Sequence, residues 1–376
     1  MSLQAPDFLD FFKSVPDHRI DRNKHYSVDE LLLLSFCAVI AGCSGWNEIE
    51  RYGNIKLNDL RSYLPYAKGS PSDDTLRRFF RALDPQAFES SFIKWVKSFQ
   101  LDLEDKVIAL DGKTSRRSFD ADAKPMHLIS AFACEFGIVL GQYKTAEKSN
   151  EITAIPELIN LLDLRGTIVT IDAMGCQHKI ARQIIDKEAD YLLALKGNQS
   201  TLCDDVQTFF EKPPTSTHFE IAEQTDKGHG RIEIRRCKVT ADIDWLRALH
   251  PQWHRLTSIV EIESIREIKG KQTIEKRYYI SSLTANARKV LHAVRHHWGI
   301  ENKLHWVLDM TYGDDQSRIR KGNAPENMAI IKKVSINLIR AIKQTHEYSR
   351  ISMKIIRQMA GWNSKVLDAI LKAKFM

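Results

Sequence analysis

The order of apolar and amphipathic segments between residues 105 and 195 constrains the fold more than any other feature of the sequence. Three apolar runs come first, and each is typical of a strand: "KVIALDGK", "HLISAFACEF" and "GIVLGQYKT". Then helical and strand patterns alternate: "EITAIPELINLLD", "GTIVTIDAM", "KIARQIIDKEA" and "DYLLALKG". Three successive strands followed by alternating helix and strand predict an α/β fold around a mixed sheet.

This order is that of a ribonuclease H-like sheet. From about residue 215 to 283, four segments alternate apolar and polar residues as strands do, and the pattern is helical from 284 to the end. No internal repeat or low-complexity linker separates these parts. We therefore interpret residues 105–376 as one ribonuclease H-like domain, interrupted by a β-rich insertion at about 215–283 and completed by a basic helical C-terminus.

Residues 1–104 have helical patterns and predict a separate α-helical domain. Ser27 precedes a helix with Glu30 three residues on, which is the pattern of a capping box. A short helix, a turn and the basic helix "SPSDDTLRRFFRAL" make a DNA-binding helix-turn-helix plausible, with Arg77, Arg78 and Arg81 directed toward phosphates. The alternative is a small helical bundle whose arginines face solvent.

Charge and composition narrow the class of protein. From residue 285 onward, 17 Lys and Arg stand against 7 Asp and Glu, a local charge of 17 − 7 = +10 within a chain of net charge +7. Such a basic region predicts a polyanionic partner, nucleic acid first. The longest apolar run, residues 31–43, is shorter than the roughly 20 residues of a membrane span. Without a visible secretory signal we expect a cytoplasmic protein with no membrane partner, associated with the nucleoid when bound to DNA.

Two acidic residues follow predicted strands directly. Asp111 comes after "VIAL" and Asp172 after "TIVTI". Carboxyl ends of neighbouring strands face a common crevice, so the two carboxylates are expected to converge, where they would repel each other without a cation between them. Mg²⁺ suits such a pair. A third acid, Glu301 in "RHHWGIENKLHWVLD", would allow two ions about 3.5–4 Å apart and a phosphoryl displacement. The alternatives are a helix-capping Asp and a solvated Glu.

The same stretch allows a different metal. On a helix His297, Glu301 and His305 are four residues apart and share a face, so they could bind zinc, although the spacing does not reproduce HExxH. Six cysteines without a CxxC pair argue against a zinc ribbon and a disulfide framework. Lys113 and Lys196 lie at strand ends and are candidate phosphate contacts, as are His229 and Arg231 in the insertion. Asp314 and Asp315 are better explained by a turn than by a metal site.

Several of these motifs together resemble the ISAs1 family of transposases, which includes the H-repeat-associated proteins and belongs with the IS4-like DDE transposases. They are "VIALDGKTSRRS", "TIDAMGCQ", "DYLLALKGNQ", "HGRIEIRRCKV", "RYYISSL" and "HHWGIENKLHWVLDMTYGDD". The resemblance implies a DDE triad at Asp111, Asp172 and Glu301 that holds two Mg²⁺ ions, with Mn²⁺ as a substitute. It also implies hydrolysis at element ends, attack of the freed 3′-OH on target DNA, DNA partners (terminal inverted repeats and target) and a homodimer.

Two other functions remain open: a nuclease on the same core without strand transfer, and a DNA-binding relic of a mobile element that has lost catalysis. The sequence also departs from the broader IS4-like signature Y-x-x-R-W-x-x-E-x-x-x-x-x-x-K. The corresponding residues are Val294, His297, Trp298, Glu301 and Leu308, so the Tyr, Arg and Lys are missing. Arg295 and Lys303 are candidate replacement phosphate contacts, and His297 is the candidate substitute for the arginine.

Overall fold

A nine-stranded mixed sheet runs through the computed structural model, which describes residues 5–19, 24–119, 124–146, 151–228, 231–268 and 270–375. Within these residues the strand order is β3-β2-β1-β4-β5-β9-β8-β7-β6. The strands are β1 (Val107–Thr114), β2 (His127–Ala133), β3 (Ile138–Lys144), β4 (Ile168–Ile171), β5 (Asp190–Leu195), β6 (Glu220–Gly228), β7 (Arg231–Thr240), β8 (Ser258–Ile268) and β9 (Lys271–Ser281).

The first five strands have the predicted ribonuclease H-like order. β1, β2 and β3 form an antiparallel meander, while β4 and β5 add in parallel on the other side of β1. The strands of the insertion do not form a sheet of their own, because β9 pairs antiparallel with β5 and β8, β7 and β6 follow outward. The predicted α/β fold with a β-rich insertion and a helical N-terminal part is confirmed, and the insertion extends the core sheet.

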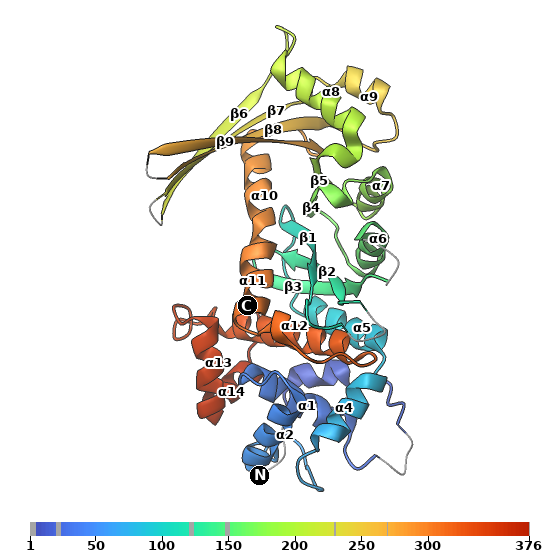
Figure 1. Cartoon of the computed structure of the whole chain (residues 1–376), viewed down its shortest axis with the longest axis vertical. Coiled ribbons are helices and arrows are strands. Elements are labelled where there is room, and N and C mark those ends of the chain that lie inside the picture. Colours follow the sequence, from blue (N-terminus) through green and yellow to red (C-terminus); the bar gives the residue numbers. More distant parts are fainter. Residues whose placement is uncertain are drawn as a thin grey trace.

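Helices cover both sides of the core strands. Helices α6 and α7 lie on one side of β1–β5, and α10 runs along the other side from the insertion toward the C-terminal helices (Figure 1). This part of the chain contains α6 (Glu151–Leu161), α7 (His178–Asp186), α8 (Ser200–Glu211), α9 (Asp244–Leu249), α10 (Ala287–Ile300) and α11 (Trp306–Met310). A π-helical segment, Glu301–His305, joins α10 to α11.

The N-terminal helices begin at the predicted caps. The Ser27 side chain accepts from the Glu30 N–H while the Glu30 carboxylate accepts from the Ser27 N–H, so the capping box is confirmed. Ser72 caps the helix that carries Arg77, Arg78 and Arg81. The helices are α1 (Val28–Ile40), α2 (Trp46–Ile55), α3 (Leu57–Leu60), α4 (Asp73–Ala82) and α5 (Pro85–Lys97).

The C-terminal helices return to the N-terminal ones. These are α12 (Ala324–Ile342), α13 (Met353–Trp362) and α14 (Ser364–Leu371), and they lie beside α1 (Figure 1). The Asn327 side chain donates to the carbonyls of Phe80 and Leu83, and Arg357 donates to the carbonyl of Val39. Residues from both ends of the chain thus share one core, and the domain boundary at 104/105 stays a prediction. None of the described helices is long and apolar enough to cross a membrane.

Candidate active site

Asp111 lies on β1 just beyond the point where β1 stops pairing with β4. The parallel pairing ends at Leu110 and Ile171, but β1 continues beside β2 as far as Thr114. Asp111 therefore lies within the β1–β2 ladder and not at the end of the strand. Burial, the largest cause, and nearby carboxylates, first among them Asp172, together raise the pKa of Asp111 to about 7, although the Gly112 N–H that donates to its Oδ1 lowers the pKa.

Asp172 follows the last residue of β4 and begins a short 3₁₀ helix, Ala173–Gly175. Its Oδ1 accepts from the N–H groups of Met174 at 3.0 Å and Gly175 at 3.4 Å. The helix-capping alternative therefore describes a real interaction, and it uses one carboxylate oxygen. Burial raises the pKa of Asp172, and the Glu151 charge adds to this effect. The cap fixes the direction of the carboxylate relative to β4.

Glu301 lies at the junction of α10 and the π-helical segment. The segment is closed by the N–H of Trp306, which donates to the Glu301 carbonyl, an i→i+5 hydrogen bond. Such π-bulges occur frequently at functional sites. The Glu301 side chain is 55% exposed, and its Oε2 lies 2.9 Å from His305 Nδ1. His305 Nδ1 is also 3.5 Å from Asp111 Oδ2, so this imidazole lies between two of the three predicted acids.

All three predicted acids line one cavity of about 330 Å³. β1 supplies Asp111, the end of β4 supplies Asp172, and the end of α10 supplies Glu301. The geometry thus brings together three residues separated by as many as 190 positions (301 − 111) in the sequence. Other lining side chains are those of Thr170, Leu192, Lys196, Arg277, Tyr279, Val294, His297 and Trp298.

His297 is not placed as a cationic substitute for the missing arginine. Its Nδ1 lies 3.0 Å from Thr170 Oγ1, and burial together with the Arg277 charge lowers the pKa of His297 to about 4. The imidazole is therefore neutral near pH 7. The zinc alternative is weakened too, because His297 is engaged with β4 whereas His305 turns to Glu301 and Asp111.

Arg277 of β9 is a cation in the cavity that sequence reasoning missed. Its guanidinium carbon lies 5.1 Å from the centre of the Trp298 ring, and Glu275 accepts from it at 2.8 and 3.1 Å. The insertion therefore contributes directly to the wall of the cavity. Its strand pattern was visible in the sequence, but the pairing of β9 with β5 that carries Arg277 there was not.

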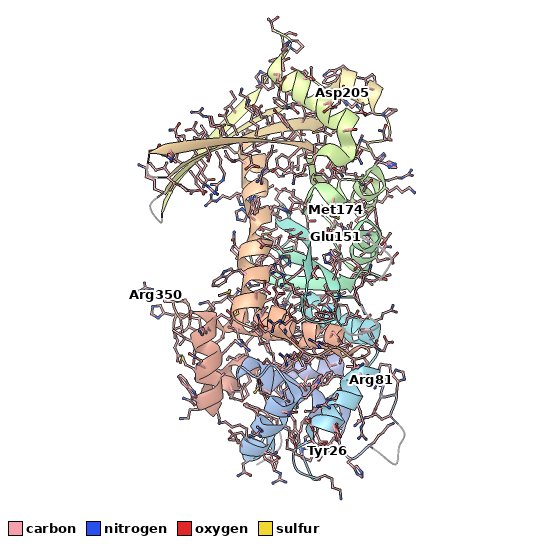
Figure 2. The ribbon with its side chains drawn as sticks, in the orientation of Figure 1. Tyr26, Arg81, Glu151, Met174, Asp205 and Arg350 are labelled. Carbon is pink, nitrogen blue, oxygen red and sulfur yellow. The ribbon has the colours of Figure 1, made fainter. Side chains whose placement is uncertain are left out.

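A second missed feature is a pair formed by Glu151 and His127. Glu151 begins α6, and its Oε1 lies 2.7 Å from His127 Nε2, while His127 Nδ1 lies 2.7 Å from Thr114 Oγ1. Figure 2 shows Glu151 near Met174, which follows Asp172 by two residues. A Cβ at Gly112 would fall 2.0 Å from Glu151 Oε1 and 2.4 Å from His127 Nε2. The "LDGK" glycine thus makes room for a fourth carboxylate whose charge acts on both Asp111 and Asp172.

The predicted DNA-contacting lysines and arginines fall into different environments. Lys196 is exposed and lines the cavity. Lys113 is only 11% exposed and pairs with Asp309 at 2.6 Å and Asp315 at 3.5 Å, so its charge is already engaged within the protein. Arg295 pairs with Asp226, and Lys303 donates to the Cys134 carbonyl at 3.3 Å.

The remaining predicted contacts lie far along the chain from the acids. Arg77 and Arg78 are 49% and 82% exposed on α4, where they pair with acids of the same helix, Asp73 and Asp74. Arg81 is exposed as well (Figure 2). Arg231 begins β7, but its side chain and all of His229 lie outside the described residues.

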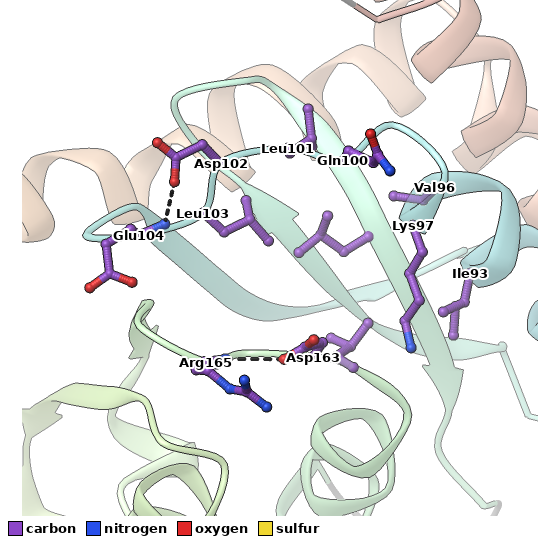
Figure 3. Close-up of a pocket in the computed structure, with 12 residues that line it drawn as sticks. Ile93, Val96, Lys97, Gln100, Leu101, Asp102, Leu103, Glu104, Asp163 and Arg165 are labelled. Atoms are coloured by element: carbon purple, nitrogen blue, oxygen red, sulfur yellow. Dashed lines mark hydrogen bonds between the residues drawn. The ribbon is translucent and has the colours of Figure 1, made fainter.

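Another cavity, of about 310 Å³, lies at the opposite ends of the strands (Figure 3). Leu103 and Glu104 before β1, and Asp163 and Arg165 before β4, contribute to its lining. None of the predicted site residues lines it. In an α/β sheet, ligands bind at the carboxyl ends of the strands, which places chemistry at the acidic cavity instead.

The acidic cavity suits a hard divalent cation. Carboxylate oxygens are the ligands that Mg²⁺ prefers. The pKa values of Asp111 and Asp172 are raised first by burial and then by neighbouring carboxylates, whose negative charge a cation would neutralise. Ligand atoms of Asp111, Glu301 and His305 all lie within 4.8 Å of one another, and Asp172 lines the same cavity but lies outside this group. The residues present therefore fit a divalent metal site.

Comparison with known proteins shows the family of the chain. A family model described as "Transposase DDE domain" matches residues 92–338, and one described as "DDE_Tnp_1-associated" matches residues 9–96. The chain belongs to the DDE transposase family. Transposases of this family generally use divalent metal ions and cleave or transfer DNA.

Relatives of this transposase chain are similar over nearly its full length. "Putative transposase YncI" of Escherichia coli O157:H7 is 43% identical and covers 91% of this chain and 89% of its own. "H repeat-associated putative transposase YhhI" of Escherichia coli K12 is 39% identical, covering 90% and 91%. A piggyBac transposase complex aligns over 98% of this chain and 77% of its own, at 10% identity and a TM-score of 0.43. The predicted H-repeat type of the IS4-like DDE transposases is confirmed.

Proposed function

We propose that this protein is an insertion-sequence transposase that cuts the ends of its own element and joins them to target DNA, with Asp111, Asp172 and Glu301 as metal ligands. The observation that carries the proposal is that these three acids line one cavity, next to the point where β1 stops pairing with β4. Two Mg²⁺ ions, for which Mn²⁺ can substitute, would stabilise the attacking and leaving oxygens of a phosphodiester displacement.

The protein's own residues prepare the site for this reaction. The N–H groups of Met174 and Gly175 fix one oxygen of Asp172, and His305 holds Glu301 toward Asp111. Because ionised carboxylates only accept hydrogen bonds, we assign the proton of His305 to Nδ1, which faces Glu301 and Asp111. Nε2 of His305 is buried and has no hydrogen-bond partner among the described residues. The acids are thus held in place before DNA arrives, so little reorganisation accompanies catalysis.

DNA is expected to enter over the cationic wall of the cavity. Lys196 and Arg277 line it on the side of β5 and β9, and their charges suit phosphates next to the reacting one. Arg277, with a planar guanidinium, takes the role that the sequence pattern leaves without its arginine, since His297 is neutral. The exposed arginines of α4 would hold DNA farther from the reaction as part of a DNA-binding N-terminal domain.

Hydrolysis at an element end frees a 3′-OH, and that hydroxyl then attacks a phosphodiester of the target without a covalent enzyme intermediate. Because two ends are cut together, a homodimer on DNA is part of the proposal, as is a cytoplasmic, nucleoid-associated location.

The experiment uses the full chain and a labelled duplex carrying the terminal inverted repeat that flanks its gene. Wild type with Mg²⁺ should nick the duplex at the repeat and, with target DNA added, give joined products. Asp172→Asn should give neither. Nicking without joined products would support the nuclease alternative, and binding without any turnover would support the inactive relic. The second alternative has a precedent, because "Inactive transposase YbfQ" of Escherichia coli K12 is 32% identical over 76 residues.

A further inference from the structure

A second group of metal-binding side chains lies outside the acidic cavity. Glu135, His292 and His296 each offer one ligand atom, and these atoms lie within 4.8 Å of one another. Both histidines are on α10, four residues apart and on the same face, while Glu135 lies in the turn between β2 and β3. From these residues we propose a site for one divalent transition-metal ion of the Zn²⁺ class that joins α10 to the core sheet.

The hydrogen bonds of His296 and Glu135 favour metal coordination by both residues. His296 Nδ1 lies 2.9 Å from the His292 carbonyl oxygen, and only a protonated Nδ1 can donate to it, which leaves the lone pair on Nε2. Metal-binding histidines almost always donate their other ring N–H in this way. Both carboxylate oxygens of Glu135 lie 3.1 Å from the N–H of Val107, the first residue of β1, which orients the carboxylate and leaves other lone pairs available.

The imidazole rings of His292 and His296 lie close together. The ring centroids of His292 and His296 are 3.8 Å apart, with 29° between the ring planes. Burial and the neighbouring His296 lower the pKa of His292. Neutral imidazole is the form that binds metal. Zn–N bonds of 2.0–2.1 Å place ligand atoms about 3.3 Å apart, so only a small rotation of partly exposed side chains would close the site.

The donor set distinguishes this site from the acidic cavity. Two imidazoles and one carboxylate suit Zn²⁺ and related ions, whereas Mg²⁺ prefers oxygen ligands. Three protein ligands leave the fourth tetrahedral position to water. Positive charges nearby limit the affinity: Lys106 acts on His292, and Lys303 donates to the carbonyl of Cys134, the residue before Glu135.

The proposed metal site lies between the two elements that supply Asp111 and Glu301, β1 and α10. Glu135 is bound to the first residue of β1, the strand that carries Asp111, and the histidines lie five and nine residues before Glu301 on α10. An ion here would connect the two elements that supply Asp111 and Glu301. It would stabilise the folded chain by binding that state alone.

The test is Zn²⁺ binding to the full-length protein in excess Mg²⁺, read by competition with a chromogenic chelator, together with the Zn²⁺-induced shift in melting temperature. Wild type should bind one equivalent and melt at a higher temperature with Zn²⁺. Loss of a residue that only hydrogen-bonds to a metal ligand lowers metal affinity roughly 10–100-fold. His292→Ala and His296→Ala each remove a ligand itself, so each should lower the Zn²⁺ affinity by more than this. Both variants should melt like wild type without Zn²⁺, since the side chains are at least partly exposed.

Two further variants separate this site from other histidines. His346→Ala removes an exposed histidine far along the chain and should leave Zn²⁺ binding unchanged. His305→Gln removes the histidine of the acidic cavity, and this variant should also still bind one equivalent of Zn²⁺. The proposal is overturned if the His292→Ala/His296→Ala double variant keeps that equivalent, if His305→Gln loses it, or if wild type binds none.

Discussion

Replacing Asp314 with Asn should destabilise the fold by several kcal/mol, because it would leave a buried lysine without its counter-charge. Asp314 Oδ1 lies 2.6 Å from Lys332 Nζ on α12, and its Oδ2 accepts from the Ser115 hydroxyl at 2.6 Å. The side chains of Asp314 and Lys332 are 8% and 4% exposed. This pair ties the segment after α11 to α12 and to the residue that follows β1.

The magnitude follows from the pKa of Asp314. Burial alone would raise it, but the Lys332 charge and the hydrogen bonds from Lys332 and Ser115 outweigh burial and lower the pKa to about 2. Against about 3.9 in an unfolded chain, the difference corresponds to roughly 2.5 kcal/mol. Asn also leaves the Lys332 ammonium buried and unpaired, and breaking one side of a buried pair costs about 3–5 kcal/mol.

The pH dependence has a definite sign. The folded-state pKa of Asp314 is depressed, so its stabilisation is fully present above about pH 4 and is lost as the pH falls toward 2. Urea unfolding at pH 7 should give Asp314→Asn a free energy of unfolding about 3–5 kcal/mol below wild type. The difference should shrink as the pH is lowered from 4 toward 2.

A matched control is the exposed pair Arg247–Asp244, which has the same 2.6 Å separation but side chains that are 49% and 95% exposed. Asp244→Asn should cost less than about 1 kcal/mol, since solvent screens exposed pairs. An Asp314→Asn variant that lost no more free energy of unfolding at pH 7 than Asp244→Asn would show that the buried pair contributes no more than the exposed one.

Three other changes test the architecture of the cavity. Gly112→Ala should lower the rate of Mg²⁺-dependent cleavage at least tenfold with little change in melting temperature. The reason is that its Cβ would fall 2.0 Å from a carboxylate oxygen of Glu151, which would have to move. Cleavage at the wild-type rate would contradict this expectation. Arg277→Gln should weaken binding of the element end and reduce the salt slope of binding by about 1. His297→Gln should leave that slope unchanged because the imidazole is neutral, and a reduced slope would show that His297 carries the charge instead.

Local sequence rules predicted the parts of the fold that depend on short-range patterns. The strand order around β1, the capping box at Ser27 and the positions of Asp111 and Asp172 after apolar runs all follow from periodicity and the carboxyl-end rule. They could be predicted because each depends on neighbouring residues or on a general property of α/β sheets. Glu301 was proposed as the third acid from the chemical need for another carboxylate and from the family resemblance, because no local pattern places it beside the two aspartates.

Long-range register and helix irregularity set the limits of prediction. Arg277 reaches the cavity because β9 pairs with β5 across more than 75 residues of chain, and no local pattern specifies that pairing. Glu151 acts on both aspartates because α6 begins beside β2, which its sequence does not reveal. The sequence also does not reveal the π-helical segment, in which His305 lies beside Glu301 and Asp111, whereas His297 contacts β4.

Asp111, Asp172 and Glu301 are proposed to form one metal-dependent catalytic site. The most direct measurement is the Mg²⁺-dependent rate of cleavage of a labelled element end by wild type, Asp111→Asn, Asp172→Asn and Glu301→Gln, with Asp315→Asn as an acidic control that does not line the cavity. Charge stabilisation by a metal is worth several kcal/mol, so each triad variant should be slower by at least about 100-fold while still binding the DNA. The control should stay within a few-fold of the wild-type rate. Cleavage at the wild-type rate by any one triad variant would show that its residue is not a ligand of the catalytic metal.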